Sequence, residues 1–198
     1  QQYLMEVENV LLYRTGQKTC DQFQDTAIKA LHLTVPNWNI HESIVHFYSK
    51  EEITLLNQIA ISYRLQRKSD IGVHIIASVY ETLEKSAIDL TERAEEAVML
   101  LATWKNLLTD LEEYDEAIEK ADRGIKIALQ SERGDKLDTL VYEKGWSNIH
   151  KNCHDEQDMR ENIKICLAAY FISDLYNRER NKKDIKKFLG HYGVKPEF

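Results

Sequence analysis

Between residues 101 and 128, apolar side chains recur at intervals of three and four, which is the spacing of one face of an α-helix. Leu101, Trp104 and Leu108 form such a face before an acidic turn at residues 112–113. After the turn, the same spacing carries a stripe of small residues, namely Ala117, Ala121 and Gly124. Small side chains let two helix backbones approach closely. The segment therefore predicts an antiparallel helical hairpin on which neighbouring helices stack.

The same helical period continues through most of the chain. Ser49 and Glu52 form a capping-box pattern that marks the beginning of one helix. Pro36 interrupts another, because proline cannot continue a helix. The helices predicted in this way span residues 2–14, 19–32, 51–67, 70–86, 91–111, 114–130, 135–152, 155–177 and 181–190, with a short helix at 39–48.

Two of these predicted helices show which side chains form their inner faces. In the helix at 19–32 these are Phe23, Ala27, Ala30 and Leu31. The helix at 51–67 has one apolar strip of Ile53, Leu56, Ala60 and Tyr63 and a second strip of Leu55 and Ile59. A helix with two apolar strips packs on both sides, as an inner helix of a solenoid does. Leu101, Trp104 and Leu108 are likewise expected in the core.

The composition supports an all-α fold. The 198 residues include only two prolines and seven glycines, with 30% charged and 43% hydrophobic residues. This mixture is typical of long helices and does not suit a β-sandwich, which needs many turn residues. The net charge of −7 does not favour binding to DNA or to anionic membranes. The odd set of cysteines, Cys20, Cys153 and Cys166, has no CxxC spacing and indicates a reducing cytoplasm.

The helical pairs show partial sequence repeats. Ala60 and Gly72 are small residues twelve positions apart, with an aromatic residue, Tyr63, between them, as in a tetratricopeptide repeat. The later units deviate from this pattern, because Lys105 stands twelve residues before Ala117 and Gln157 stands twelve residues after Gly145. Successive units are 40 to 45 residues apart, compared with the usual ~34. Longer helices account for this difference.

Several stretches resemble the C-terminal domains of the peptide-sensing tetratricopeptide regulators of Gram-positive bacteria, the Rap, NprR, PlcR, PrgX and Rgg group. These stretches are residues 30–38, 49–63, 167–175, 185–189 and 191–194. The resemblance implies one repeat domain over residues 1–198, built as a right-handed superhelix of about four antiparallel hairpins and a C-terminal helix. It also implies a homodimer, a concave groove that captures a short oligopeptide, and a DNA-binding helix-turn-helix upstream of Gln1.

In this geometry the first helix of each hairpin lines the groove. Asparagine amides suit a peptide backbone because they offer both a donor and an acceptor. The groove candidates are Asn57, Arg64, Asn106, Thr109, Tyr142, Trp146 and His150. Arg64 is suited to a peptide carboxylate, and Tyr142 or Trp146 to an apolar side chain. The competing interpretation is structural, because an asparagine on an amphipathic helix is more often solvated or a helix cap.

No pattern in the sequence indicates catalysis, a cofactor or a metal. His150, Cys153 and His154 lack a second ligand pair at zinc spacing. The acidic clusters at 110–116 and 155–158 fall at turns and helix N-termini, where anions favour the helix dipole. The basic stretch 178–187 is interpreted as a solvated helix face, with contact to DNA phosphates in a longer regulator as the alternative. Glycine loops for phosphate and GxSxG elbows are absent from the sequence.

The leading hypothesis is a cytoplasmic, non-enzymatic sensor domain that binds a short peptide and relays its presence to an attached DNA-binding domain. The relay would be a shift between conformations that bind the peptide unequally. The first alternative is a tetratricopeptide adaptor that holds a segment of a protein partner, without DNA binding. The second alternative follows the Rap branch, in which the repeat domain sequesters or dephosphorylates a response-regulator protein. No run of apolar residues is long enough to span a membrane.

Overall fold

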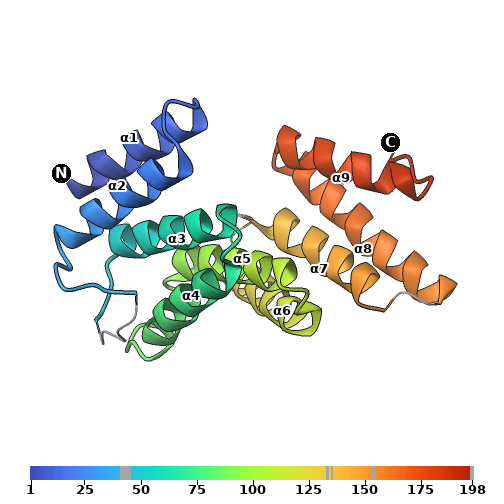
Figure 1. Ribbon diagram of the computed structural model, residues 1–198. Helices are drawn as coiled ribbons and strands as arrows, with labels where there is room; N and C mark the ends of the chain where they lie inside the picture. Colours follow the sequence, from blue (N-terminus) through green and yellow to red (C-terminus); the bar gives the residue numbers. More distant parts are fainter. Residues whose placement is uncertain (41–45, 133, 135, 153–154, 197–198) are drawn as a thin grey trace. The chain divides into compact units, whose positions relative to one another are not determined.

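The computed structural model describes residues 1–40, 46–132, 134, 136–152 and 155–196. This part of the chain is helical and contains no strand (Figure 1). Its helices are α1 (Gln2–Arg14), α2 (Cys20–His32), α3 (Lys50–Leu65), α4 (Ser69–Glu84), α5 (Ala94–Asp110), α6 (Tyr114–Gln130), α7 (Leu137–Asn152), α8 (Glu156–Leu175) and α9 (Glu179–His191). The prediction of an all-α chain with about four hairpins and a final helix is confirmed. None of these helices is long and apolar enough to cross a lipid bilayer.

The chain divides into two compact units, an N-terminal unit of residues 1–96 and a C-terminal unit of residues 97–198. In the N-terminal unit, α2 packs against α1 and α3, and α3 packs against α4. In the C-terminal unit, α7 packs against α6, α8 and α9, and α8 also packs against α9. The helix α7 is therefore the centre of the C-terminal unit.

One turn geometry recurs at three of the connections between helices. Arg67, Glu112 and Asn177 have φ values of 61°, 61° and 54°, in the left-handed region. The amide of the residue that follows each of them donates to the carbonyl oxygen five residues earlier, at 2.9, 2.9 and 2.8 Å. This is the Schellman arrangement, which satisfies the last carbonyl groups of a helix and reverses the chain. It keeps the connections α3–α4, α5–α6 and α8–α9 short.

The inner faces predicted for the N-terminal unit are confirmed. On α2 the side chains of Phe23, Ala27, Ala30 and Leu31 are buried, and on α3 Ile53, Leu55, Leu56, Ile59 and Ala60 are almost inaccessible. Tyr63, at the end of the first strip, is half-buried. Complete burial of each leucine or isoleucine contributes about 1.5–3 kcal/mol. The predicted capping box is also present, because the Ser49 hydroxyl accepts from the Glu52 amide while the Glu52 carboxylate accepts from the Ser49 amide.

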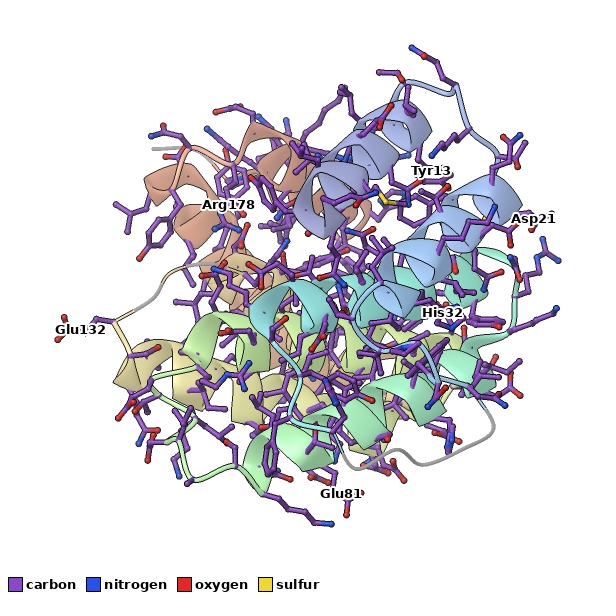
Figure 2. The ribbon with its side chains drawn as sticks, turned by 90° about the vertical axis from the view of Figure 1, so that its left-hand side faces the viewer. Tyr13, Asp21, His32, Glu81, Glu132 and Arg178 are labelled. Atoms are coloured by element: carbon purple, nitrogen blue, oxygen red, sulfur yellow. The ribbon has the colours of Figure 1, made fainter. Side chains whose placement is uncertain are left out.

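The first hairpin differs from the expected pattern of apolar packing. Leu4, Val7 and Leu11 on α1 are exposed. The buried residue of α1 is Asn9, whose Nδ2 donates to the carbonyl oxygen of Phe23 at 2.8 Å. Tyr13 packs its ring against the Phe23 ring, with centroids 4.8 Å apart, at the end of the hairpin where Figure 2 labels Tyr13 and Asp21. Gln2 Nε2 also donates to the carbonyl oxygen of Ala30 at 3.0 Å, so polar contacts and an aromatic pair help to hold α1 on α2.

The short helix predicted at 39–48 lies partly on residues 41–45, which are outside the described residues. The described residues on either side, 39–40 and 46–48, are not helical. Tyr48 is buried there, and its carbonyl oxygen accepts a hydrogen bond from Arg93 Nη2 at 3.2 Å. The end of this connection is thus fixed by an arginine that precedes α5.

The C-terminal unit shows why its repeat pattern departs from the usual spacing. A Cβ atom on Gly145 of α7 would lie 2.6 Å from Cys166 Sγ and 2.9 Å from the carbonyl oxygen of Asn162. The close partner of Gly145 is therefore the α8 backbone near Cys166, and not Gln157, because the long helices displace their crossing point. Burial raises the pKa of the Cys166 thiol to about 12, so it remains a protonated core thiol at neutral pH.

Lys105 occupies the position at which the repeat pattern expects a small residue. Its side chain is fully buried on α5, and its Nζ lies 2.9 Å from a carboxylate oxygen of Glu143 on α7. A buried lysine needs such an anionic partner, because an isolated buried charge is strongly unfavourable. The pair therefore joins α5 to α7 by an ionic contact where other repeats use a close approach of two backbones.

Candidate functional site

A cleft opens between α7 and α9 in the C-terminal unit, and we call it the α7–α9 cleft. Its larger part has a volume of about 360 Å³. This part is lined by Trp146, His150, Asp184, Lys187, Phe188, His191 and Tyr192. A neighbouring part of about 110 Å³ is lined by Thr139, Tyr142, Glu143, Asn181, Asp184 and Ile185. Asp184 lines both parts, so they adjoin.

The lining residues follow from the helical period. On α7 the lining positions are 139, 142, 143, 146 and 150, on α9 they are 181, 184, 185, 187, 188 and 191, and Tyr192 follows directly after α9. The spacings of three and four place each set on one face of its helix. Neighbouring positions of the same helices enter the core, where Ile149 of α7 lies in a cluster with Cys166 and Leu189, and Ile185 belongs both to this cluster and to the floor of the cleft. The core packing therefore fixes which side chains reach the cleft.

Aromatic rings form the wall of the cleft. Tyr142 and Phe188 meet edge to face with centroids 5.5 Å apart, and Phe188 lies 5.2 Å from Tyr192. The imidazole of His150 stacks on the indole of Trp146, with centroids 3.5 Å apart and an angle of 19° between the planes. Tyr114, at the beginning of α6, approaches both rings of this stack. Such a wall offers a large rigid surface to an apolar side chain.

Tyr142 adds a polar group to this wall. Burial raises the pKa of its hydroxyl well above the usual value, and the nearby Glu143 carboxylate raises it further. The hydroxyl is therefore protonated under all physiological conditions. It can donate a hydrogen bond within the narrow part of the cleft.

A buried carboxylate fixes α9 against α7. Asp138, in the first turn of α7, is completely buried. Its Oδ2 accepts from Ser173 Oγ of α8 and from Asn181 Nδ2 of α9, each at 2.8 Å, and its Oδ1 lies 3.3 Å from Arg178 Nη1. Arg178 is the residue immediately before α9 and is labelled in Figure 2. One carboxylate thus holds three helices at the narrow end of the cleft.

The structure brings part of the predicted groove set together. Tyr142, Trp146 and His150 all line the α7–α9 cleft. Asn106 and Thr109 lie half-buried on α5 and do not line it. Within the described part of the chain, the buried Oγ1 of Thr109 has no hydrogen-bond partner. A peptide-binding role for all of these residues stays a prediction.

The remaining predicted groove residues, Asn57 and Arg64, lie on α3 in the N-terminal unit. Asn57 is buried, and its Oδ1 likewise finds no hydrogen-bond partner among the described residues. Arg64 is half-buried. Their role in peptide binding also stays a prediction.

The contribution of α9 to the cleft was not predicted. Residues 178–187 were expected to form a solvated basic face, whereas Asp184 and Lys187 line the cleft together with Phe188, His191 and Tyr192. A signal was present, since Asp184, Phe188, His191 and Tyr192 recur at spacings of three and four and end in aromatic residues. The buried positions Ile185 and Leu189 lie between them and orient this face.

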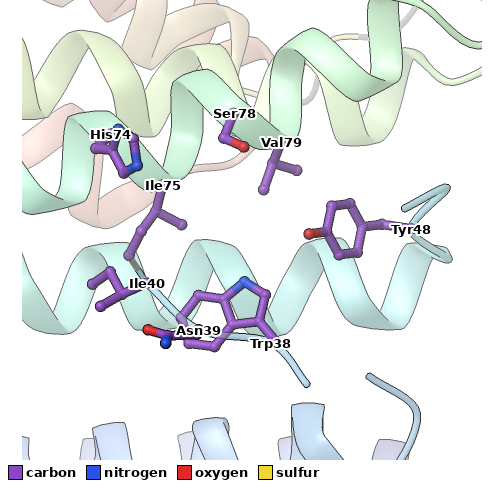
Figure 3. A pocket seen from close by; sticks show the side chains of 8 residues that line it. All are labelled: Trp38, Asn39, Ile40, Tyr48, His74, Ile75, Ser78 and Val79. Atoms are coloured by element: carbon purple, nitrogen blue, oxygen red, sulfur yellow. The ribbon is translucent and has the colours of Figure 1, made fainter. Parts of the chain in front are cut away.

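A smaller pocket in the N-terminal unit is less suited to a ligand. Its lining comes from the α2–α3 connection and from α4, and Figure 3 shows Ile40 and Ile75 pointing toward one another across it, with Trp38 beside them. Its volume is about 20 Å³, which is room for little more than one water molecule. The described residues also include no group of three or more His, Cys, Asp or Glu side chains arranged to hold a metal ion.

The stacked hairpins of the two units place the chain in the class of all-α helical-repeat proteins with a tetratricopeptide-like fold. The model of the RNPP family C-terminal domain matches residues 1–187, and the chain belongs to this family. A comparison with curated protein sequences gave no match.

A solved structure has the same fold. It is the crystal structure of Bacillus thuringiensis PlcR in complex with the peptide PapR7 and DNA. The match has a TM-score of 0.76 and 17% sequence identity, and it covers 93% of the present chain. The chain spans 60% of the length of that PlcR chain. The likeness confirms the tetratricopeptide-like architecture that the sequence predicted.

Proposed function

We propose that this chain is the sensor domain of a cytoplasmic regulator and that it binds a short peptide in the α7–α9 cleft. The observation that carries the proposal is the aromatic cleft of about 360 Å³ in the C-terminal unit of a chain from the RNPP family. The volume is within the usual range for ligand pockets, and so is the mixture of aromatic walls with a few charged groups. The PlcR structure, with its peptide, supports the same class of ligand.

The proposed role is regulatory and not catalytic. The charged groups of the cleft are arranged along aromatic walls, an arrangement suited to recognition of a ligand. Any contact with DNA would be made by a further domain of a longer protein, since the chain spans 60% of the PlcR chain that was solved with DNA. The peptide would act on that domain by favouring one conformation of the regulator over another.

Trp146 supplies the largest aromatic surface of the cleft, and its replacement by alanine should weaken peptide binding. We expect the Trp146→Ala protein to bind hexapeptides about 10- to 100-fold more weakly than the unchanged protein, because a central aromatic anchor contributes about 1–3 kcal/mol. The measurement is isothermal titration with hexapeptide pools that end in Phe, Leu or Ile.

The matched control is Phe47→Ala, which removes another aromatic ring. Phe47 is 71% exposed and lines none of the pockets described above. Its replacement should leave peptide affinity unchanged within about twofold. Equal peptide affinity in the Trp146→Ala and unchanged proteins would show that the peptide does not bind in the α7–α9 cleft. If no peptide pool bound the unchanged protein, the proposed peptide-binding function would be wrong.

A further inference from the structure

Basic side chains line the wide part of the α7–α9 cleft and not its narrow part. Lys187, His150 and His191 line the wide part, Asp184 lines both parts, and Glu143 lines the narrow part, where it pairs with Lys105. Residue numbers increase in the same direction along both walls, so the two helices run in parallel past the cleft. From Tyr142 to His150 the rise along α7 is about 12 Å, which matches about three to four residues of an extended peptide.

The ammonium group of Lys187 is available to a ligand. Lys187 is exposed on α9, and among the residues that the structure describes neither it nor Asp184 forms an ion pair. Lys182, five residues earlier on α9, is by contrast paired with Asp174. The wide end of the cleft therefore holds a positive charge that the neighbouring side chains do not neutralise by contact.

The two histidines are oriented in the same way. His150 Nδ1 lies 2.8 Å from the carbonyl oxygen of Trp146, and His191 Nδ1 lies 2.8 Å from the carbonyl oxygen of Lys187. A carbonyl oxygen only accepts, so each Nδ1 carries the donated proton. A ring with its proton on Nδ1 presents Nε2 as an acceptor, which does not donate to an anion. The donor that the wide end offers to an anionic ligand is therefore the ammonium group of Lys187.

The ammonium group of Lys187 and the aromatic rings beside it suit a carboxylate that adjoins an apolar side chain. At neutral pH a free peptide C-terminus is ionised, and its last side chain is held within a few ångströms of that charge. The aromatic rings of Trp146 and Phe188 lie in the same part of the cleft as Lys187. An acidic side chain offers the same carboxylate chemistry, but it does not combine the charge with an adjoining apolar side chain on one residue.

We propose that the cleft binds its peptide with the free C-terminal carboxylate at Lys187. The last side chain then packs against Trp146 and Phe188, and the peptide runs back into the narrow part of the cleft. This inference rests on the proposed peptide-binding function and adds the direction of the peptide and the requirement for an unmodified C-terminus.

The test compares hexapeptide pools that end in Phe, Leu or Ile and contain no Asp or Glu. One set carries free C-terminal acids and the other set carries C-terminal amides. We expect the free acids to bind about tenfold more tightly than the amides, because the acids form a charge-assisted hydrogen bond with Lys187 that the amides cannot form. In the Lys187→Gln protein this ratio should fall to about twofold or less, as measured by isothermal titration.

The control for charge is Lys186→Gln, because Lys186 is also exposed on α9 but does not line the cleft. It should keep the tenfold ratio, and a loss of the ratio in this variant would overturn the assignment to Lys187. Equal binding of acids and amides would overturn the direction while leaving peptide binding intact. Binding of neither set would overturn both proposals.

A third set separates the two sources of carboxylate. It consists of amidated hexapeptides that end in Glu. We expect these to bind as weakly as the other amides. Affinity equal to that of the free acids would assign the wide end to an acidic side chain and contradict the proposal.

Discussion

Replacement of Asp138 by alanine is expected to destabilise the C-terminal unit by about 3–5 kcal/mol, because it removes a buried charge from a network of hydrogen bonds. The Ser173 hydroxyl and the Asn181 amide would both lose their 2.8 Å acceptor. Arg178 would lose its carboxylate partner at the beginning of α9. The free energy of unfolding, measured by urea denaturation with circular dichroism, gives the difference directly.

Two further variants serve as controls for the Asp138→Ala measurement. Asp138→Asn keeps the shape of the side chain but places a donor against donors, so we expect a loss between that of alanine and zero. Asp122→Ala removes a carboxylate from the half-exposed pair with Lys144, where the N–O distance is 2.6 Å, and should cost no more than about 1 kcal/mol. If Asp138→Ala cost no more than Asp122→Ala, the buried network would not be what holds α9 against α7.

Replacement of Gly145 by alanine is the second large effect. The added Cβ would lie 2.9 Å from the backbone oxygen of Asn162 and 2.6 Å from Cys166 Sγ, and a backbone atom cannot rotate away as a side chain can. Overpacking of this kind costs about 1–3 kcal/mol or more, against a gain of about 1 kcal/mol in helix propensity. We expect a net loss of about 2 kcal/mol in the same urea measurement.

Gly190 is the matched control, because it lies on α9 and an added Cβ would have no atom within 4 Å. Gly190→Ala should therefore be neutral or stabilising by up to about 1 kcal/mol. Equal effects of the two substitutions would show that α7 and α8 do not cross closely at Gly145. A larger loss in Gly145→Ala would confirm that the close crossing replaces the usual pairing of small residues.

The helices could be predicted because their signals are local. Thr19 and Ser49 begin α2 and α3 with complete capping boxes, and the apolar strips of α3 are buried as their spacing predicts. The position of Gly145 against Cys166 could not be predicted in this way. It depends on helix length and crossing, which a fixed spacing of twelve residues does not describe.

Of the two walls of the cleft, only the α7 wall could be predicted, because the position of α9 depends on packing between helices. Tyr142, Trp146 and His150 could be placed on one face of α7 from periodicity alone. That this face meets Lys187 and Phe188 depends on the packing of α9, which Asp138 fixes from a distance of about forty residues in the chain. The charged residues of α9 favoured a different interpretation, because a basic amphipathic helix more often has a solvated surface.

The central claim, that a peptide binds between α7 and α9, is tested most directly by amide hydrogen exchange with and without a bound free-acid hexapeptide. At 100 times the dissociation constant, binding stabilises the bound form by about 2.7 kcal/mol, which slows exchange by up to about 100-fold. If the peptide binds in the α7–α9 cleft, the slowing is largest at residues 139–151 and 181–192. Slowing confined to α1–α4, or unchanged exchange in α7 and α9 under a peptide that binds, would contradict it.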